Sequence, residues 1–388
     1  MIRSLLVCLL AIGSAAAQSI SFPAGADHVS LPFTENRNHM VIQVGINGTP
    51  PQPAVLDTGA HGAVLNGDAN TMAQYHLKPS DLHAEVRGAG GGGTHMQAQI
   101  DSNVTFDLEG ASLTGNQLAV IERPLMPGLP AFVVGQSIFR NFVVQVDYIS
   151  HQVTLYDPAK FHYTGKGAEL PLEFDEHGLP YVKAKVSLPD AKDLPVKLVL
   201  DTGASHPLSL QYGSTPEIKE PQNAEKRVIG RGASGEVRGY VLNSPSFTLA
   251  GFTMTEVPTT YPDESLGHLL RNDANGNLGS GILRRFTVTY DYQHNRIFLE
   301  PNSEFGAPFP PIPPPRTEAA KRKAGALSAA HRDLPGFSIS GISELRVPAP
   351  QRCQPLCRRC LLSSPTNETK YRFPAFDHFT LTTSLSYK

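Results

Sequence analysis

The stretch Ala54-Val55-Leu56-Asp57-Thr58-Gly59-Ala60 decides the fold, because its last four residues return unchanged as Asp201-Thr202-Gly203-Ala204. At average residue usage, one such tetrapeptide is expected on the order of 10⁻² times in a chain of this size. Two matched copies therefore do not arise by chance. Each copy follows an apolar run, which predicts a buried strand that delivers an acid to a tight turn. Glycine makes such a turn possible.

The offset of 144 residues between the two copies also relates many other positions. The matching pairs are Arg87 and Arg231, Gly88 and Gly232, Gly91 and Gly235, Gly135 and Gly279, Ile138 and Ile282, Arg140 and Arg284, Phe142 and Phe286, Asp147 and Asp291, Tyr148 and Tyr292, and Leu155 and Leu299. A match this long indicates a tandem duplication, in which each half is one structural repeat.

Three features of the duplicated region resemble the aspartic proteases, most closely the bacterial retropepsin-like ones. They are the apolar-apolar-Asp-Thr-Gly-Ala loop, the glycine-rich segment after Arg87, and the segments Val133-Val134-Gly135 and Asn277-Leu278-Gly279. The resemblance covers residues 38–302. Retroviral enzymes take their two loops from two identical subunits, and pepsins take them from two lobes of one chain. The resemblance therefore implies an all-β, bilobal, closed-barrel fold with two tandem lobes and the active site between them.

The resemblance also assigns roles to residues of this chain. Asp57 and Asp201 are the expected catalytic pair. The expected supporting residues are Thr58, Gly59, Thr202 and Gly203, of which the threonines would hydrogen-bond to the opposite loop. The candidate flap residues are Gly88, Gly90, Gly91, Gly232 and Gly235, because glycine-rich hairpins suit an element that closes over substrate. A flexible surface loop is the alternative, and it competes more strongly in the second half.

Ala60 and Ala204 depart from the pepsins, which usually carry Ser or Thr at this position. A hydroxyl there can donate a hydrogen bond to a catalytic carboxylate and lower its pKa. Alanine has no such donor. We therefore expect the pair to keep its shared proton to higher pH than a pepsin pair, which shifts the working range toward mild acid or neutrality.

The first 17 residues predict a signal peptide. Arg3 precedes an apolar stretch, and small residues end at Ala17, before Gln18. The stretch is shorter than the ~20 apolar residues that span a bilayer. Lipidation at Cys8 is the alternative, but Cys8 lies too near the start to follow an apolar region. We expect a periplasmic or secreted protein without a membrane span.

Charge and cysteine content bear on possible nucleic-acid partners and metal sites. The 33 basic and 35 acidic residues balance, so nothing in the composition points to nucleic acid. Beyond the signal peptide, cysteine occurs only at Cys353, Cys357 and Cys360, whose spacing favours free thiols over a structural zinc site. A proline-rich run near residue 310 then leads into a basic segment without periodicity. We predict an N-terminal lobe at 38–160, a C-terminal lobe at 167–302, and a linker and disordered tail at 303–388.

Other titratable residues near the motifs have simpler interpretations. Asp147 and Asp291 each precede Tyr and a polar turn, so we interpret both as hairpin residues. His61 and His206 follow the motifs, and packing or solvent-facing roles are expected for them. The glycines around Gly90 lack the Lys-Ser or Lys-Thr of a phosphate-binding loop.

These observations predict an exported, monomeric aspartic endopeptidase that acts on a peptide or protein substrate. Two adjacent carboxyl groups share a proton, so one can activate water while the other donates to the carbonyl oxygen. Such chemistry needs neither metal nor cofactor. The alternative is a noncatalytic peptide-binding protein that keeps the fold. A processing enzyme with a single envelope partner is a narrower form of the first possibility.

Overall fold

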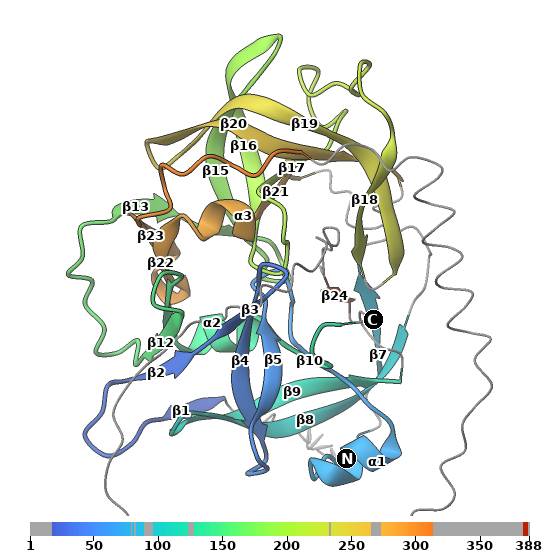
Figure 1. Cartoon of the computed structure of the whole chain (residues 1–388). Coiled ribbons are helices and arrows are strands. Elements are labelled where there is room, and N and C mark those ends of the chain that lie inside the picture. The colour runs from blue at the N-terminus through green and yellow to red at the C-terminus, as the bar shows by residue number, and fades with distance from the viewer. Residues whose placement is uncertain are drawn as a thin grey trace, which may run out of the picture. The chain divides into compact units, whose positions relative to one another are not determined.

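The computed structural model describes residues 18–78, 80, 83–88, 96–122, 128–232, 234–264, 273–312 and 383–386. The described residues up to 312 and residues 383–386 belong to one compact unit (Figure 1). The predicted signal peptide, Cys8 and the three tail cysteines lie outside the described residues. Within the described part of the chain, no helix is long and apolar enough to cross a membrane.

The first half of the chain builds a closed barrel. Its sheet contains β1 (Ser19–Ser21), β3 (Thr34–Asn36), β4 (His39–Ile46), β5 (Gln52–Leu56), β6 (Ala63–Asn66), β7 (His83–Gly88), β8 (Met96–Leu108), β9 (Ala111–Ile121), β10 (Phe132–Val134) and β24 (Thr383–Ser386). Six strands pair in the order β9-β6-β10-β5-β4-β8, and β8 pairs back to β9. Closure removes the exposed edges that an open sheet would leave.

The second half repeats this barrel with new strands. They are β14 (Glu173–Phe174), β15 (Pro180–Leu188), β16 (Ala191–Asp201), β17 (Leu208–Leu210), β18 (Arg227–Gly232), β19 (Gly235–Leu249), β20 (Phe252–Pro262) and β21 (Gly276–Gly279). The ring runs β15-β16-β21-β17-β20-β19 and closes through a β15–β19 pairing. The predicted all-β, bilobal fold of two closed barrels is thus confirmed.

A third sheet takes strands from both halves and joins them. In order it contains β13 (Ala168–Pro171), β23 (Arg296–Pro301), β22 (Phe286–Asp291), β11 (Val143–Asp147), β12 (Gln152–Tyr156) and β2 (His28–Pro32). At its centre β11 pairs antiparallel with β22, and Gln145 faces Thr289, its own duplicate. Gln145 Nε2 donates to Thr289 Oγ1 at 3.1 Å. A residue that faces its own equivalent marks a local two-fold axis between the lobes.

Short helical segments lie between the strands of the described residues. They are α1 (Ala69–Gln74), α2 (Gln136–Asn141), α3 (Ser280–Leu283) and a 3-10 helix at Tyr292–His294. The first, α1, is capped by Asp68, whose side chain accepts from Thr71 N at 2.9 Å. Both α2 and α3 begin directly after the repeated glycines Gly135 and Gly279. The two halves therefore share helical positions as well as strands.

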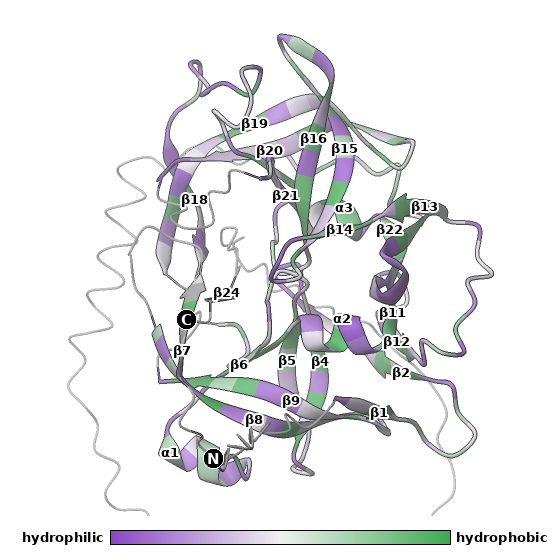
Figure 2. Ribbon diagram, turned by 180° about the vertical axis from the view of Figure 1, so that it is seen from behind, coloured by the Kyte–Doolittle hydropathy of each residue, from purple (hydrophilic) through white to green (hydrophobic). Residues whose placement is uncertain are grey.

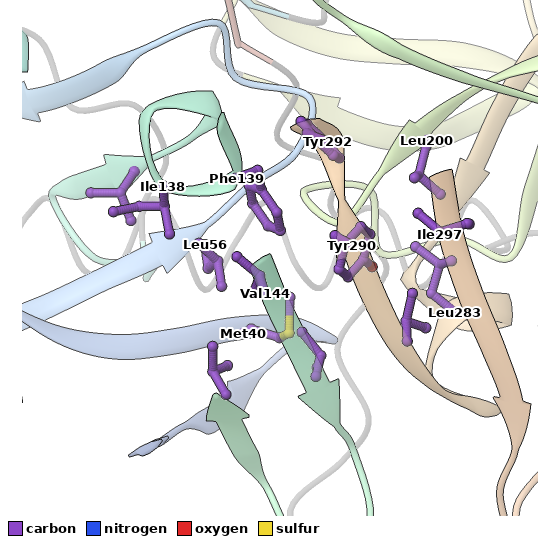
Figure 3. Close-up of a cluster of buried hydrophobic side chains, with 14 of the residues drawn as sticks. Met40, Leu56, Ile138, Phe139, Val144, Leu200, Leu283, Tyr290, Tyr292 and Ile297 are labelled. Carbon is purple, nitrogen blue, oxygen red and sulfur yellow. The ribbon is translucent and has the colours of Figure 1, made fainter. Parts of the chain in front are cut away.

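The apolar core runs continuously from one lobe to the other beneath the motifs. Leu56 and Leu200, the residues before the two aspartates, lie in one cluster with Met40, Phe139 and Tyr290 (Figure 3). Strands such as β15 alternate hydrophobic and hydrophilic residues, and the hydrophobic ones are buried (Figure 2). A fully buried leucine contributes about 1.5–3 kcal/mol. This shared core therefore anchors both motif loops.

Polar contacts cross between the lobes from equivalent arginines of the repeat. Arg284 of the second half reaches Glu35 Oε2 at 3.2 Å and Asn38 Oδ1 at 3.0 Å. Its duplicate Arg140 in the first half donates to His177 O at 3.1 Å. Each lobe thus uses the same arginine of the repeat to contact the other.

The packed chain extends past both ends of the predicted lobes. Before residue 38, β1 pairs with β9 and β2 pairs with β12. After residue 302, Arg285 Nη1 donates to Glu304 O at 3.2 Å and Phe305 O at 3.0 Å, and its guanidinium lies 3.7 Å from the Phe309 ring centre. β2 has a counterpart in β13, since Leu31 faces Val153 as Leu170 faces Ile297, but the two strands are 139 residues apart, so the offset of 144 did not indicate them. The second lobe therefore continues at least to Phe309.

One segment of the predicted disordered tail is a strand. Residues of β24 pair antiparallel with β7, from Thr383 opposite Gly88 to Ser386 opposite Glu85. The tail residues between 313 and 382 lie outside the described residues. For them the prediction of disorder stays a prediction.

We expect the segment 303–309 to contribute to stability. A chain ending after Ile312 should fold with a melting temperature close to that of the full chain, whereas one ending after Asn302 should melt about 5–10 °C lower. The shorter chain loses the half-buried rings of Phe305 and Phe309 and leaves Arg285 without its carbonyl partners. Thermal unfolding followed by circular dichroism measures the difference. Equal melting temperatures would show that this segment is dispensable.

Candidate active site

Two equivalent turns carry the repeated motif. Asp57 directly follows β5, and Asp201 is the last residue of β16. Each strand runs parallel to a neighbour, β10 or β21, and Asp57 N donates to Val134 O at 2.9 Å. The turns close through Ala60 N to Asp57 O and Ala204 N to Asp201 O, both at 3.3 Å. Short turns between buried strands place both acids rigidly at the junction of the lobes.

The two threonines of the motif bind the loops to each other. Thr58 Oγ1 donates to Leu200 O at 2.8 Å and accepts from Thr202 N at 2.9 Å. In return, Thr202 Oγ1 donates to Leu56 O at 3.0 Å and accepts from Thr58 N at 3.0 Å. Both side chains are fully buried. The predicted cross-loop hydrogen bonds are thus present in both directions.

The two carboxyl groups converge between the motif glycines. A β-carbon built on Gly59 would lie 2.7 Å from Asp201 Oδ1 and 3.1 Å from Asp57 Oδ1, so both oxygens border the same small space. A β-carbon on Gly203 would overlap the Asp57 carboxyl group. Asp57 and Asp201 are both 0% exposed. The structure therefore brings together the two acids that the sequence predicted, and both glycines are required for that approach.

Burial makes the Asp57 carboxyl group hold its proton. Its pKa lies well above the ordinary value of an aspartate, first because burial disfavours the charged form and second because Asp201 repels a further negative charge. The hydrogen bond from Gly59 N to Asp57 Oδ1, at 2.8 Å, acts in the opposite direction and is weaker. Two such groups share one proton across a range of pH, which provides an acid and a base side by side.

Comparison with protein-family models identifies the family of the chain. A family model described as aspartyl protease matches residues 42–138 and 183–283, which together make up just over half of the chain and contain one motif each. The chain belongs to the aspartyl protease family. Among solved structures, an aspartic proteinase from Irpex lacteus is 14% identical, with a TM-score of 0.45, and the match covers 73% of this chain and 100% of that one. No curated protein sequence matches the chain.

Asn277 is a site residue that the sequence reasoning did not assign. It lies on β21, and its Nδ2 donates to Asp201 Oδ2 at 2.7 Å. Asp201 therefore has a side-chain donor from a position other than Ala204, and the predicted shift of the working range stays a prediction. A signal was present in the sequence, because the repeat places Val133 at the equivalent position of the first half. A polar residue in an otherwise apolar strand next to the motif could have indicated it.

A histidine from the first lobe supports the second motif loop. His39 is buried, with Nε2 3.0 Å from Gly203 O and Nδ1 3.1 Å from Asn36 O. Burial lowers the pKa of its imidazole, so the neutral ring is favoured. A neutral imidazole has a single N–H. His39 therefore donates to one of these carbonyls at a time and fixes the loop without adding charge beside the aspartates.

The candidate flap residues belong to two hairpins, one in each half. Gly88 ends β7, and Gly232 and Gly235 face each other across the turn between β18 and β19. The hairpins approach each other from the two lobes (Figure 1), and Gly88 N donates to Ser234 Oγ at 3.3 Å. Gly90 and Gly91 lie outside the described residues. Both halves thus supply a hairpin, although the closing role over substrate stays a prediction.

The other acids and histidines near the repeat lie in structural positions. Asp147 accepts from Ile149 N and Ser150 Oγ in its own turn. Asp291 accepts from Arg296 Nε at 2.9 Å and contacts His294 Nδ1 at 2.8 Å. Their interpretation as hairpin residues is confirmed. After the motifs, the His61 ring packs 5.7 Å from the ring of His177, and His206 is half-buried.

We expect Gly59→Ala and Gly203→Ala to abolish peptide cleavage, because either methyl group would displace a carboxyl group of the pair. Gly306→Ala is the matched control, since a β-carbon there meets nothing within 4 Å. The measurement is the rate of cleavage of an unfolded protein substrate, together with a circular dichroism spectrum that shows each variant is folded. Near-normal cleavage by Gly203→Ala would contradict the geometry described for Asp57.

Proposed function

We propose that this chain is an aspartic endopeptidase that cleaves peptide bonds with a water molecule activated between Asp57 and Asp201. The observation that carries the proposal is the burial of these two carboxyl groups against one another, with the threonines of both motifs cross-bonded beneath them. A fold that served only as a scaffold gains nothing from this arrangement, because burying two adjacent acids costs free energy.

The reaction needs one ionised and one protonated carboxyl group. The ionised group removes a proton from water as the water oxygen attacks the peptide carbonyl carbon, and the protonated group gives its proton to the carbonyl oxygen. The resulting tetrahedral diol carries one hydroxyl group from water and one formed from the carbonyl oxygen. The aspartate that took the proton from water then gives it to the amide nitrogen as the carbon–nitrogen bond breaks. The other aspartate takes a proton from one hydroxyl group of the diol as the carbonyl group re-forms, which leaves a carboxylic acid and an amine. The aspartate pair finishes with the single proton with which it began.

The two hairpins support an extended peptide as the substrate. Strand pairs that reach toward each other from both lobes, with contact between Gly88 and Ser234, can cover a chain segment lying over the aspartates. Extended peptides bind by main-chain hydrogen bonds to strand edges, which are largely independent of sequence. This fits an endopeptidase, which must accept the interior of a polypeptide.

We expect Asp57→Asn and Asp201→Asn each to abolish cleavage, with a loss of at least about 10³-fold. The double variant should be no worse than either single one, because the two groups act as a unit. Asp147→Asn is the control, since that carboxyl group bonds only within its own turn among the described residues. The measurement is cleavage of an unfolded protein substrate across mildly acidic to neutral pH. A wild-type chain that binds peptides but cleaves none would favour the noncatalytic alternative.

We also propose that the protein is exported and that its signal peptide is removed after Ala17. Gln18 would then be the first residue, and it is held on the first lobe, because its Nε2 donates to Asn116 Oδ1 at 3.1 Å and Asn141 Nδ2 donates to its Oε1 at 3.0 Å. Sequencing the N-terminus of protein recovered from a bacterial periplasm or medium should give Gln18 first. An intact Met1 in the cytoplasm, or a lipid on Cys8, would contradict the proposal.

A further inference from the structure

We propose that Asn277 makes the two aspartates unequal, so that Asp201 carries the negative charge of the pair and Asp57 carries the proton. In catalysis, Asp201 then removes the proton from water and Asp57 donates to the carbonyl oxygen. This division of roles rests on the proposed peptidase function. The distribution of charge itself does not, because it follows from the hydrogen bonds of the protein alone.

The geometry around Asp201 favours its ionised form. Asn277 faces Val199 of β16 and Ser209 of β17, so two strands fix its backbone. Its Nδ2 lies 2.7 Å from Asp201 Oδ2. That distance lies at the short end of the range for N–H···O hydrogen bonds. An amide N–H can only donate, so it stabilises a carboxylate more than a carboxylic acid.

The equivalent position beside Asp57 offers no such donor. Val133 occupies the same place in the repeat and faces Val55 of β5, as Asn277 faces Val199. Asp57 accepts a main-chain hydrogen bond from Gly59 N at 2.8 Å, but that bond reaches Oδ1, and its buried Oδ2 has no side-chain donor such as Asn277 within the described part of the chain. A carboxyl oxygen in that situation is better protonated than charged. The duplication therefore gives two carboxyl groups the same backbone and different partners.

The other titratable and charged groups around the pair do not reverse this assignment. The groups with a direct contact or an electrostatic effect are His39, Tyr292 and Arg140. His61 and His206 follow the two motifs in the sequence, and the His61 ring packs against His177. The imidazole of His39 favours its neutral form and contacts the carbonyl of Gly203. Burial raises the pKa of Tyr292 well above its usual range, and the charges of both aspartates raise it further, so its phenol stays neutral beside either one. Arg140 lowers that pKa from its place beside Tyr292.

The direct test is a titration of the full chain labelled with carbon-13 at the aspartate carboxyl groups. Nuclear magnetic resonance separates carboxylic acid from carboxylate, and Asp57→Asn and Asp201→Asn assign the two signals. Between the two titration steps, we expect the Asp201 signal in the carboxylate position and the Asp57 signal in the acid position. The reverse order, or two signals that move together, would overturn the inference.

Two reciprocal substitutions test the effect of the Asn277 side-chain amide on the ionisation of the aspartates. Asn277→Val gives the second half the residue of the first, and the ionisation of Asp201 should then require a pH about 1 unit higher, which is the shift expected for a lost hydrogen bond to a charged group. Val133→Asn places an amide beside Asp57 Oδ2 and should lower the pH at which Asp57 ionises. If the Val133→Asn variant does not fold because position 133 is buried, comparison of the wild type with Asn277→Val still tests the role of Asn277. An unchanged Asp201 titration in Asn277→Val would refute the assignment.

The pH profile of peptide cleavage provides a second readout. In Asn277→Val the acidic limb should move up by about 1 unit, because the pair then stays doubly protonated to higher pH. A merely structural loss would lower the whole profile without moving the limb. If the wild type cleaves nothing while the carbon signals remain unequal, the proposed peptidase function fails and the charge assignment stands.

Discussion

The unfavourable burial of two adjacent carboxyl groups is the constraint on which the rest of this structure depends. Neither Asp57 nor Asp201 is exposed, and a buried charge costs several kcal/mol unless partners compensate for it. The structure meets that cost by sharing a proton between the groups and by holding their loops with reciprocal threonine hydrogen bonds. Because Gly59 and Gly203 carry no β-carbon, the loops can approach closely enough for the sharing. The residues of the motif therefore act as one unit that makes the burial of two adjacent carboxyl groups possible.

The two-fold relationship of the lobes follows from that unit. A contact in which each threonine bonds the other's loop can form only if both loops present the same surface, as in a symmetric dimer. The central sheet has the same local two-fold axis, since Gln145 faces its duplicate Thr289. The barrels then close individually, and the apolar cluster around Leu56 and Leu200 passes between them. Packing and hydrogen bonding thus depend on the same symmetry.

The sequence predicted what the repeat encodes and missed what only tertiary contacts create. The aspartates, threonines and glycines of the site were found because each occurs twice at one offset. The strand β2 has its counterpart β13 at an offset of 139 residues rather than 144, and the pairing of β1 with β9 and of Arg285 with the segment after residue 302 depends on tertiary contacts that the repeat does not specify. Asn277 was visible only as a departure from Val133, and its hydrogen bond to Asp201 depends on a side-chain orientation that spacing does not determine.

Fusion of the two halves into one chain is what allows the site to become asymmetric. In a dimer of identical subunits every residue appears twice, so a donor that favours charge on one aspartate would equally favour it on the other. Among the described residues, the second loop has partners without equivalents beside the first: Asn277 at Asp201, and His39 from the other lobe at Gly203 O. A shared proton needs no symmetry, and an acid and a base work best when their proton affinities differ. The duplicated chain can therefore keep the two-fold geometry that holds the pair together while assigning its members different protonation states.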